Sequence, residues 1–505
     1  MVLKLKVKPF DYQLDAAKFA FKRASSILSL ATGSGKTVIS ILEAIISLST
    51  HKVDKVVQIC TKKSKISYKN DYENLTEIEL GEDLTVINYS EDLIDFMQHP
   101  NIKIAVVQYE TFKSIDEYLW VNLFKNHKTL VQIDEYHKCK APVLELYLDD
   151  CNILCQHSVK KPPEIVTRLW HLRSFITCLT GYTATPISRD INDAFWLGIL
   201  AKPGLFANNS LLQFYTNFLD FRAYKIPIKK GSPFKRTVID VLGLKNESIL
   251  KSLLDSVTYY YFPPKDINFV KVNYEPLSVR VNYEKAVNGM LDIYNERKIN
   301  DATGVKEDKT FSARMLDIQY VLNNSEEKKQ ALMNTLKDTL SHGVLIYASY
   351  YETVDAIKEV LDKCRIGYQE ITGKSTDRQC EKVMDWFNSN PENKVVILTA
   401  AGSQSINLQA TDNFIFYDIP FTASGLIQAL GRICRVGSKY NRFNCYIIYS
   451  KDTLDEYKYL YLSSNQEVLS YLQGNNTLYV TDLKGRNTQV LRMLRKQKVW
   501  ANNIN

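Results

Sequence analysis

Residues 30–37 read Leu-Ala-Thr-Gly-Ser-Gly-Lys-Thr, which has the residue types and spacing of a phosphate-binding loop. Glycines at 33 and 35 let the backbone turn tightly, so that successive N–H groups point at an oxyanion. Lys36 adds a positive charge for terminal phosphates, and the Thr37 hydroxyl is a ligand for the magnesium ion that accompanies them. We therefore expect a nucleoside triphosphate to bind here through Thr32, Gly33, Ser34, Gly35, Lys36 and Thr37.

An acidic pair, Asp134 and Glu135, follows the apolar run 130–133. At the end of a buried strand, Asp134 can hold magnesium and Glu135 can accept a proton from an attacking water. An acidic pair alone is more typical of a strand end followed by a solvated turn. The phosphate loop about 100 residues upstream favours the catalytic interpretation.

The elements around these motifs alternate between short apolar strands and helices. Residues 27–30 predict a strand before the loop, and an apolar stripe at helical spacing predicts a helix after it. Further strands are predicted at 56–60, 104–109, 130–134 and 175–179, and again at 344–348, 395–399, 413–417 and 445–449. Continuous apolar strands with helical crossovers are typical of parallel sheets covered on both faces, so we expect an α/β protein with two such domains.

The rhythm breaks between residues 205 and 329, where we expect a mainly helical insertion and linker, including a helix at 248–257. The predicted domains are a first lobe at 1–204, this insertion at 205–329, a second lobe at 330–475 and a basic tail at 476–505. The tail mixes basic with apolar residues, so packing or partner binding is as well supported as DNA contact.

Composition is that of an ordinary globular protein, with 505 residues, a formal charge of +8 and nine cysteines. The odd cysteine count without framework spacing agrees with a reducing compartment. No run of 18 apolar residues occurs, and the lysine-rich start does not read as a secretory signal. We therefore expect a monomer in the cytoplasm, in a bacterial or host-cell interior, with no membrane contact.

Motifs spread over most of the chain resemble those of the superfamily 2 helicases, and in particular the Swi/Snf-type double-strand DNA translocases. In chain order they are residues 10–13, 30–37, 109–112, 134–140, 179–187, 193–206, 344–349, 373–375, 399–410 and 428–437. The resemblance implies two RecA-like lobes that bind ATP and Mg²⁺. Thr61, Tyr68 and the segment 402–405 depart from the family pattern, as expected for a divergent member of phage or viral type.

The resemblance also assigns roles to individual residues. Gln13 matches the adenine-sensing amide, and Gln428, Arg432 and Arg435 match the catalytic residues of the last motif. Coupling residues are His137, Thr183, Thr185, Gly402 and Asn407, and nucleic-acid contacts are Lys62, Lys63, Lys65 and Tyr109. Arg432 and Arg435 are three residues apart, so on a helix they share one face from which both guanidinium groups can reach a phosphoryl group. Surface salt bridges are the alternative for these arginines, and a solvated face is the alternative for the lysines.

One further cluster, Cys139, Cys151, Cys155 and His157, contains residue types that bind zinc. Its spacing is not a common structural-zinc pattern, so free thiols are the favoured interpretation.

These observations predict an ATP-driven motor that moves on duplex or branched DNA, for fork regression, branch migration or displacement of bound proteins. Its partners would be double-stranded or branched DNA and proteins of replication, recombination or transcription. Three alternatives stay open. The chain can instead be a strand-separating helicase on branched DNA or RNA–DNA hybrids, a transcription factor with ATPase activity associated with RNA polymerase, or a nonenzymatic DNA-binding scaffold.

Overall fold

A computed structural model describes residues 5–78, 81–139, 144–159, 163–184, 192–227, 235–262, 266–289, 311–399, 406, 408–420, 423–434 and 438–463. The predicted tail, Thr185, Gly402, Asn407 and Arg435 lie outside these residues. The chain divides into two compact units, which we call the first lobe, most of residues 5–262, and the second lobe, most of residues 263–463. No helix in the described part of the chain is long and apolar enough to cross a membrane.

The first lobe is built on a seven-stranded sheet in the order β11-β1-β8-β5-β2-β4-β3. Its strands are β1 (Ser25–Leu30), β2 (Lys55–Cys60), β3 (Leu84–Ile87), β4 (Ile104–Gln108), β5 (Thr129–Asp134), β8 (Cys178–Thr183) and β11 (Thr258–Tyr261). Every neighbouring pair is parallel, which confirms the predicted sheet type. Because parallel strands end at one edge, the segments that follow β1, β8 and β5 lie together.

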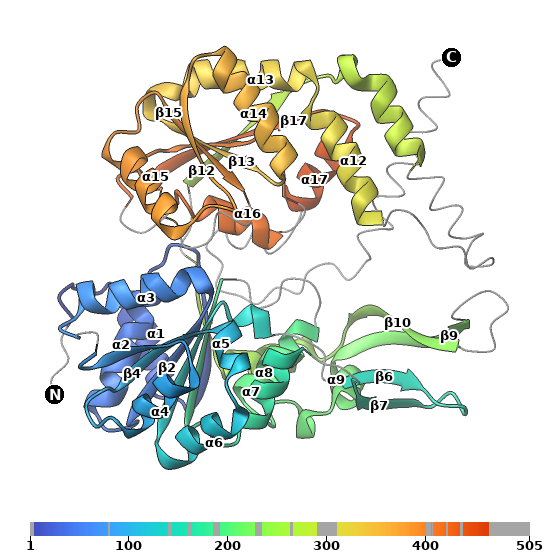
Figure 1. Cartoon of the computed structure of the whole chain (residues 1–505). Helices are drawn as coiled ribbons and strands as arrows, with labels where there is room; N and C mark the ends of the chain where they lie inside the picture. The colour runs from blue at the N-terminus through green and yellow to red at the C-terminus, as the bar shows by residue number, and fades with distance from the viewer. Residues whose placement is uncertain are drawn as a thin grey trace. The chain divides into compact units, whose positions relative to one another are not determined.

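Helices cover both faces of this sheet (Figure 1). They are α1 (Asp11–Phe21), α2 (Lys36–Ser49), α3 (Lys62–Leu75), α4 (Ser90–Gln98), α5 (Tyr109–Ser114), α6 (Glu117–Asn126), α7 (Glu164–Leu172) and α8 (Asn192–Ala201), with the 3₁₀ turn η1 (Tyr136–Cys139). Alternate strand residues face opposite sides. Val57 and Ile133 pack in the cluster with α4 to α8, whereas Val56 and Leu130 pack with α2 and α3. Asp134 has the parity of Leu130, so it lies on the α2 side.

Strand β8 begins later than predicted, at Cys178 rather than at residue 175. Thr180, Gly181 and Thr183 interrupt the apolar pattern, although all three are buried. Gly181 is required by packing, since a Cβ there would lie 2.3 Å from the ring of Tyr136. The apolar pattern misplaced this strand because β8 continues through polar and small residues to Thr183.

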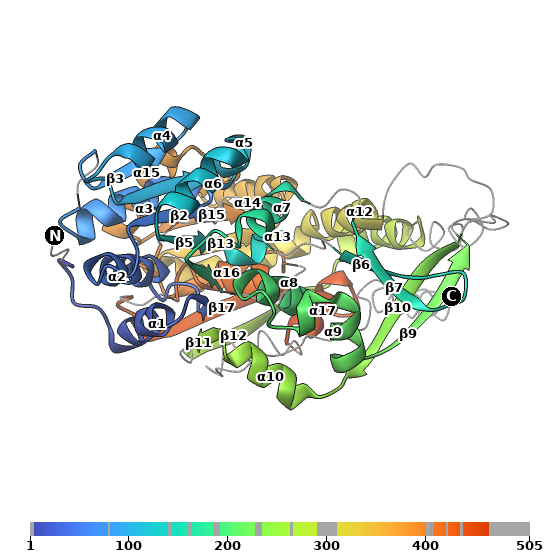
Figure 2. The same cartoon turned by 90° about the horizontal axis from the view of Figure 1, so that it is seen from below.

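The segment between the predicted lobes contains helices α9 (Leu211–Phe218) and α10 (Glu247–Asp255), of which the latter was predicted. It also contains a hairpin that was not predicted, formed by β9 (Leu219–Pro227) and β10 (Lys235–Leu244). A second hairpin that was not predicted, β6 (Leu144–Leu148) with β7 (Leu154–Ser158), belongs to the predicted first lobe and projects beside it near α9 (Figure 2). Strand β11 joins the first sheet, and β12 (Asp266–Asn273) joins the second. The domain borders that we inferred from sequence stay predictions.

The second lobe is built on a six-stranded parallel sheet in the order β12-β17-β16-β13-β15-β14. The remaining strands are β13 (Val344–Ala348), β14 (Gly367–Ile371), β15 (Lys394–Thr399), β16 (Asn413–Phe416) and β17 (Arg442–Tyr449). Its helices include α12 (Phe311–Asn323), α13 (Glu326–Thr339), α14 (Tyr351–Lys363), α15 (Asp377–Ser389), α16 (Ala423–Leu430) and α17 (Leu454–Ser463). Two parallel-sheet lobes confirm the predicted fold class.

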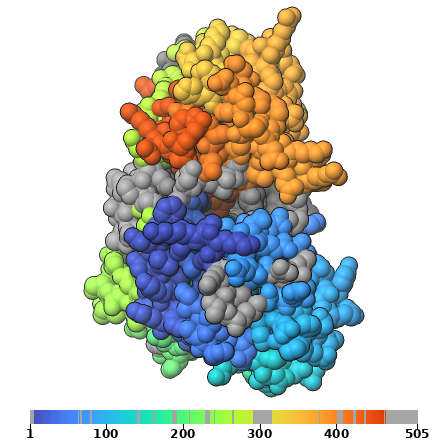
Figure 3. All heavy atoms as spheres, turned by 90° about the vertical axis from the view of Figure 1, so that its left-hand side faces the viewer, coloured from blue at the N-terminus to red at the C-terminus, as the bar shows by residue number. Residues whose placement is uncertain are grey.

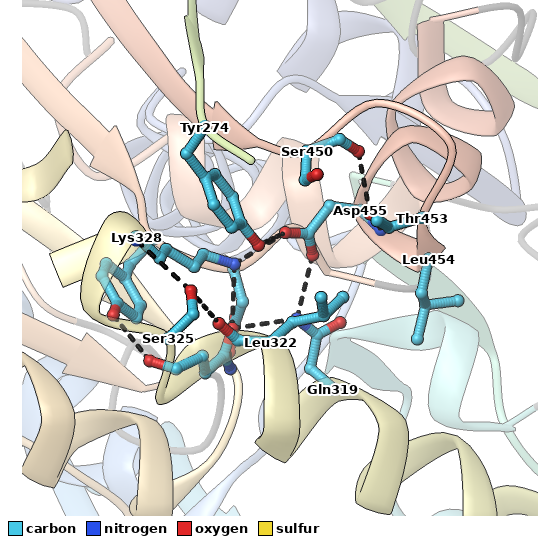
Figure 4. Close-up of polar contacts among 12 residues, drawn as sticks. Tyr274, Gln319, Leu322, Ser325, Lys328, Ser450, Thr453, Leu454 and Asp455 are labelled. Carbon is cyan, nitrogen blue, oxygen red and sulfur yellow. Dashed lines mark hydrogen bonds and ion pairs between the residues drawn. The ribbon is translucent and has the colours of Figure 1, made fainter. Parts of the chain in front are cut away.

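A buried ion pair joins the helices of the second lobe (Figure 4). Lys328 Nζ on α13 lies 2.8 Å from Asp455 Oδ2 on α17, and both side chains are fully buried. Asp455 also accepts hydrogen bonds from Gln319 on α12 and from the Tyr274 hydroxyl, at 2.9 and 2.7 Å. Although burial opposes it, Lys328 beside Asp455 and the Gln319 hydrogen bond hold the pKa of Asp455 below its ordinary value. The Asp455 carboxylate thus links α12, α13 and α17, a connection that the sequence pattern does not predict.

Candidate active site

The phosphate loop has the backbone that its glycines predict. It follows the end of β1 at Leu30 and leads into α2 at Lys36. Gly33 and Gly35 have φ values of 75° and 74°, a left-handed conformation that side chains rarely adopt. A Cβ on Gly35 would also lie 2.5 Å from Gln13 Nε2. Any substitution at Gly35 is therefore opposed by both backbone strain and a steric clash.

Residues of α1 form hydrogen bonds to the backbone of this loop. The Tyr12 hydroxyl and Gln13 Nε2 both donate to the Ser34 carbonyl, at 2.7 and 3.2 Å. Gln13 Oε1 accepts the Phe10 N–H at 3.0 Å, so this buried amide links the start of α1 to the loop. The placement supports the predicted role of Gln13 beside the nucleotide, although adenine recognition stays a prediction.

Tyr12 also connects the loop to a strand in the segment that was predicted to be an insertion. Its ring stacks on that of Tyr261, with a centroid distance of 3.8 Å and an interplanar angle of 4°. Tyr261 lies at the end of β11, and its carbonyl accepts the Ala31 N–H at 2.9 Å. The aromatic run 259–262 gave no sequence signal for this placement, because strand pairing between distant segments is not a local property.

The acidic pair lies at the end of β5. Asp134 is 7% exposed, and Glu135 follows it with a φ of 52°. Burial, and after it the charge of Glu135, raise the pKa of the Asp134 carboxyl to about 7, against the opposing effects of Lys36 and of a Ser64 hydrogen bond. Two acidic groups held together in this way are stabilised by a cation. The Asp134 carboxylate and the Thr37 hydroxyl supply the oxygen ligands that Mg²⁺ prefers, so the residues present fit this ion.

Two of the predicted coupling residues lie next to this pair. His137 Nδ1 is 3.0 Å from the Thr183 hydroxyl and 3.3 Å from Glu135 Oε2. The end of β8 and the turn after β5 are therefore linked through one imidazole. Whether this link couples hydrolysis to movement stays a prediction.

The predicted nucleic-acid contact of Tyr109 is contradicted by its position. Its side chain is 6% exposed, and its hydroxyl donates to the Asp134 carbonyl at 2.6 Å. The residue begins α5 and packs inward with Phe112 in the core of the lobe. Tyr109 therefore supports the backbone of the acidic pair instead of reaching a nucleic acid.

The lysines that were predicted to contact nucleic acid lie at the start of α3. Helix α3 lies on the left-hand side of Figure 1, which is the side that faces the viewer in Figure 3. Lys62 is exposed, and Lys65 Nζ donates to Asn88 Oδ1 at 2.8 Å. The Lys63 side chain is outside the described part of the structure. The first turn of α3 contains no acidic residue, although acidic groups are favoured by the helix dipole there. The first turn of α3 is therefore basic in its own sequence, and the acidic group beside it is Asp134, which is hydrogen-bonded to Ser64.

In the second lobe, Gln428 lies half-buried on α16. That helix ends at Leu430, so Arg432 lies in the following turn and not on the predicted helix. Gly431 at this point favours the end of a regular helix. Arg432 is 8% exposed, and its Nη1 donates to the Ile406 carbonyl at 3.3 Å. This burial argues against the surface salt bridge that was the alternative role for Arg432.

The residues of the predicted cysteine cluster lie on different elements and differ in burial. Cys139 is buried in η1, Cys151 is exposed, and Cys155 is half-buried on β7. His157 Nε2 lies 2.8 Å from Glu145 Oε1 across the β6–β7 hairpin. Within the described ranges, no three His, Cys, Asp or Glu side chains are grouped to hold a metal ion.

Comparisons with known proteins agree with this geometry. Residues 6–188 match the family described as the res subunit of type III restriction enzymes, and residues 327–437 match the helicase conserved C-terminal domain. Both matches support the resemblance to the superfamily 2 helicases. The phosphate loop and acidic pair fall in the first match, and Gln428, Arg432 and Arg435 fall in the second.

Curated relatives support the same family. The uncharacterized ATP-dependent helicase YqhH of Bacillus subtilis is 25% identical over 378 residues, 69% of this chain and 62% of that protein. The human DNA repair and recombination protein RAD54B is 21% identical over 496 residues, 86% of this chain and 50% of that protein. The chain thus covers less than two thirds of each of these relatives. A solved structure, the Sulfolobus solfataricus SWI2/SNF2 ATPase core in complex with dsDNA, aligns over 92% of both chains with 16% identity and a TM-score of 0.39.

Proposed function

We propose that this chain is a nucleic-acid-stimulated ATPase that moves along duplex or branched DNA. One observation carries the ATPase proposal. The phosphate loop, Thr183 and Asp134 follow or end three neighbouring parallel strands, β1, β8 and β5, so the two motifs occupy one edge of one sheet. This arrangement supports the binding of a nucleotide and the activation of a water at the same place.

The residues of the first lobe divide the chemistry between them. The loop amides and Lys36 would contact the phosphates, while Thr37 and Asp134 would hold magnesium. When bound, magnesium neutralises phosphate charge and favours the ionised form of the acidic pair. Glu135 then accepts the proton of the attacking water. In the second lobe, the Arg432 hydrogen bond to Ile406 steadies the turn that leads to Arg435, which we propose as the arginine finger.

The proposed track is the phosphate backbone of duplex DNA. Two kinds of support exist. The relative RAD54B is named a DNA repair and recombination protein, and the first turn of α3 contains lysines and no acidic residue of its own. We propose fork regression, branch migration or displacement of bound proteins as the result of such movement.

ATP hydrolysis is expected to be stimulated more by duplex or forked DNA than by single-stranded DNA or RNA, and less as salt rises, because phosphate contacts release counterions. Steady-state ATPase assays with single-stranded, duplex, forked and four-way DNA, and with RNA, measure this. Lys62→Ala is expected to raise the DNA concentration needed for half-stimulation, whereas Lys69→Ala serves as the control because Lys69 faces Glu73 at 4.0 Å. Stronger stimulation by single strands or RNA contradicts the duplex track, and stimulation by transcription complexes alone favours the polymerase-associated alternative.

A further inference from the structure

Glu43 is a buried acid that the assigned site does not use. It lies on α2, two turns beyond Lys36, and is 2% exposed. Glutamate is almost never fully buried unless its oxygens are paired. Here Oε1 accepts a hydrogen bond from the Thr180 hydroxyl at 2.6 Å, and Oε2 accepts one from Gln132 Nε2 at 2.8 Å and another from the Tyr182 hydroxyl.

The donors to Glu43 come from two neighbouring strands. Gln132 lies on β5, and Thr180 and Tyr182 lie on β8, which pairs with β5. Gln132 Nε2 also donates to the Ser40 carbonyl of α2 at 2.9 Å. The helix is thus attached to the sheet at two positions one turn apart, and sliding of α2 along β5 breaks both attachments.

The same two strands carry the reacting groups. Gln132 precedes Asp134 on the α2 side of β5, and Tyr182 directly precedes Thr183, which contacts His137. Because helices and strands are stiff over these lengths, the position of Glu43 on the sheet sets the position of Thr37 relative to Asp134. An apolar residue would pack in this place without the desolvation cost of a carboxyl. Burial raises the pKa of the Glu43 carboxyl above its ordinary value, although the hydrogen bonds from Thr180, Tyr182 and Gln132 oppose the rise.

We propose that Glu43 is a positioning residue of the nucleotide site, which holds α2 in register with β5 and β8 and so places Thr37 opposite Asp134 for one magnesium ion. This inference rests on the proposed function, because it presupposes that the site binds MgATP. Glu43 takes part in no chemical step, because it lies two turns beyond Lys36 on α2.

Glu43→Met is expected to lower kcat by about 100-fold, the scale of a misplacement of roughly 1 Å. The KM for ATP should change less, because the loop amides and Gln13 are intact. A binding readout separates positioning from general damage. Nucleotide affinity is measured with a fluorescent ADP analogue in EDTA and in Mg²⁺, and the increase in affinity on adding Mg²⁺ is called the magnesium gain. Glu43→Met should lose most of this magnesium gain. The Mg²⁺ concentration that gives half-maximal ATPase activity should rise.

Two comparison variants make the test decisive. Glu43→Gln keeps an acceptor for Gln132 and Tyr182 and offers a donor to Thr180, so it should restore most of kcat and of the magnesium gain. Lys55→Met serves as a destabilised control in the same lobe, because Lys55 Nζ on β2 donates to the carbonyls of Phe96, His99 and Ile102 at 2.8, 2.8 and 2.6 Å, away from the nucleotide site. It should lower the unfolding temperature and leave the magnesium gain unchanged.

The outcomes distinguish this inference from the function on which it rests. A wild-type protein that neither binds nor hydrolyses MgATP overturns both. A wild type that does both, with Glu43→Met keeping its magnesium gain and kcat, overturns the positioning role alone. An equal loss of magnesium gain in Lys55→Met and Glu43→Met also overturns it, because the effect then follows stability.

Discussion

Glu135→Gln is expected to lower the kcat for ATP hydrolysis by about 10²–10⁴-fold, the contribution of a positioned general base, while nucleotide binding is retained. The amide has the shape of the carboxylate but does not accept the proton of the attacking water. The backbone at residue 135 has a φ of 52°, a conformation that glutamate and glutamine tolerate equally poorly, so the fold should not change. Steady-state ATPase assays with saturating duplex DNA and fluorescent-nucleotide binding measure the two quantities.

The control for this variant is Glu110→Gln on α5, which removes an exposed carboxylate outside the acidic pair. It should hydrolyse ATP at the wild-type rate. Lys36→Ala is the companion variant, and it should lose hydrolysis together with affinity for the phosphates. Near-wild-type turnover in folded Glu135→Gln would show that a different group activates the water.

The second large effect is on stability. Lys328→Met is expected to lower the free energy of unfolding by about 3–5 kcal/mol, because it leaves the Asp455 carboxylate buried without its main cation. In the wild type, the lowered pKa of Asp455 contributes stability above the unfolded pKa, and this is lost as pH falls through the folded pKa. In the variant, the folded pKa rises above the unfolded value, so the variant regains stability as Asp455 binds a proton. The stability difference should therefore shrink as pH falls.

Urea unfolding of the second lobe, followed at several pH values, measures this difference. Lys363→Met on α14 is the matched control, because Lys363 is 54% exposed and faces Glu359 on the surface. Its unfolding midpoint should not change. The double variant Lys328→Met with Asp455→Asn should be more stable than the sum of the single effects predicts, since neither member of the pair is left without the other. Equal midpoints for Lys328→Met and the wild type would mean that the pair in Figure 4 does not hold the helices together.

The strands that lead into the phosphate loop and the acidic pair were predictable because their sequence patterns are local. A buried apolar run, a glycine turn and an amphipathic helix identify the loop between β1 and α2 without any partner. The strands at the sheet edges were not predictable in the same way. The aromatic run of β11 gives no local sign that it pairs with β1 or that Tyr261 stacks on Tyr12.

Three site residues depend on packing that the sequence does not show. Tyr109 matches a family motif, but only the packing of α5 decides that its hydroxyl turns inward to the Asp134 carbonyl. Arg432 was placed on a helix by its spacing, although α16 ends before it at Leu430. Glu43 lies on a helix that is buried on most sides, so the apolar stripe of α2 hides a polar attachment that depends on β5 and β8.

The most direct test of the account is displacement of a third DNA strand from a triplex on an otherwise intact duplex. A motor that follows the duplex backbone is expected to strip the third strand in the presence of MgATP without opening the underlying duplex, and Glu135→Gln is expected to leave the triplex intact. Release that occurs only together with strand separation would contradict the duplex track, as would ATP-dependent movement on single strands with no triplex displacement.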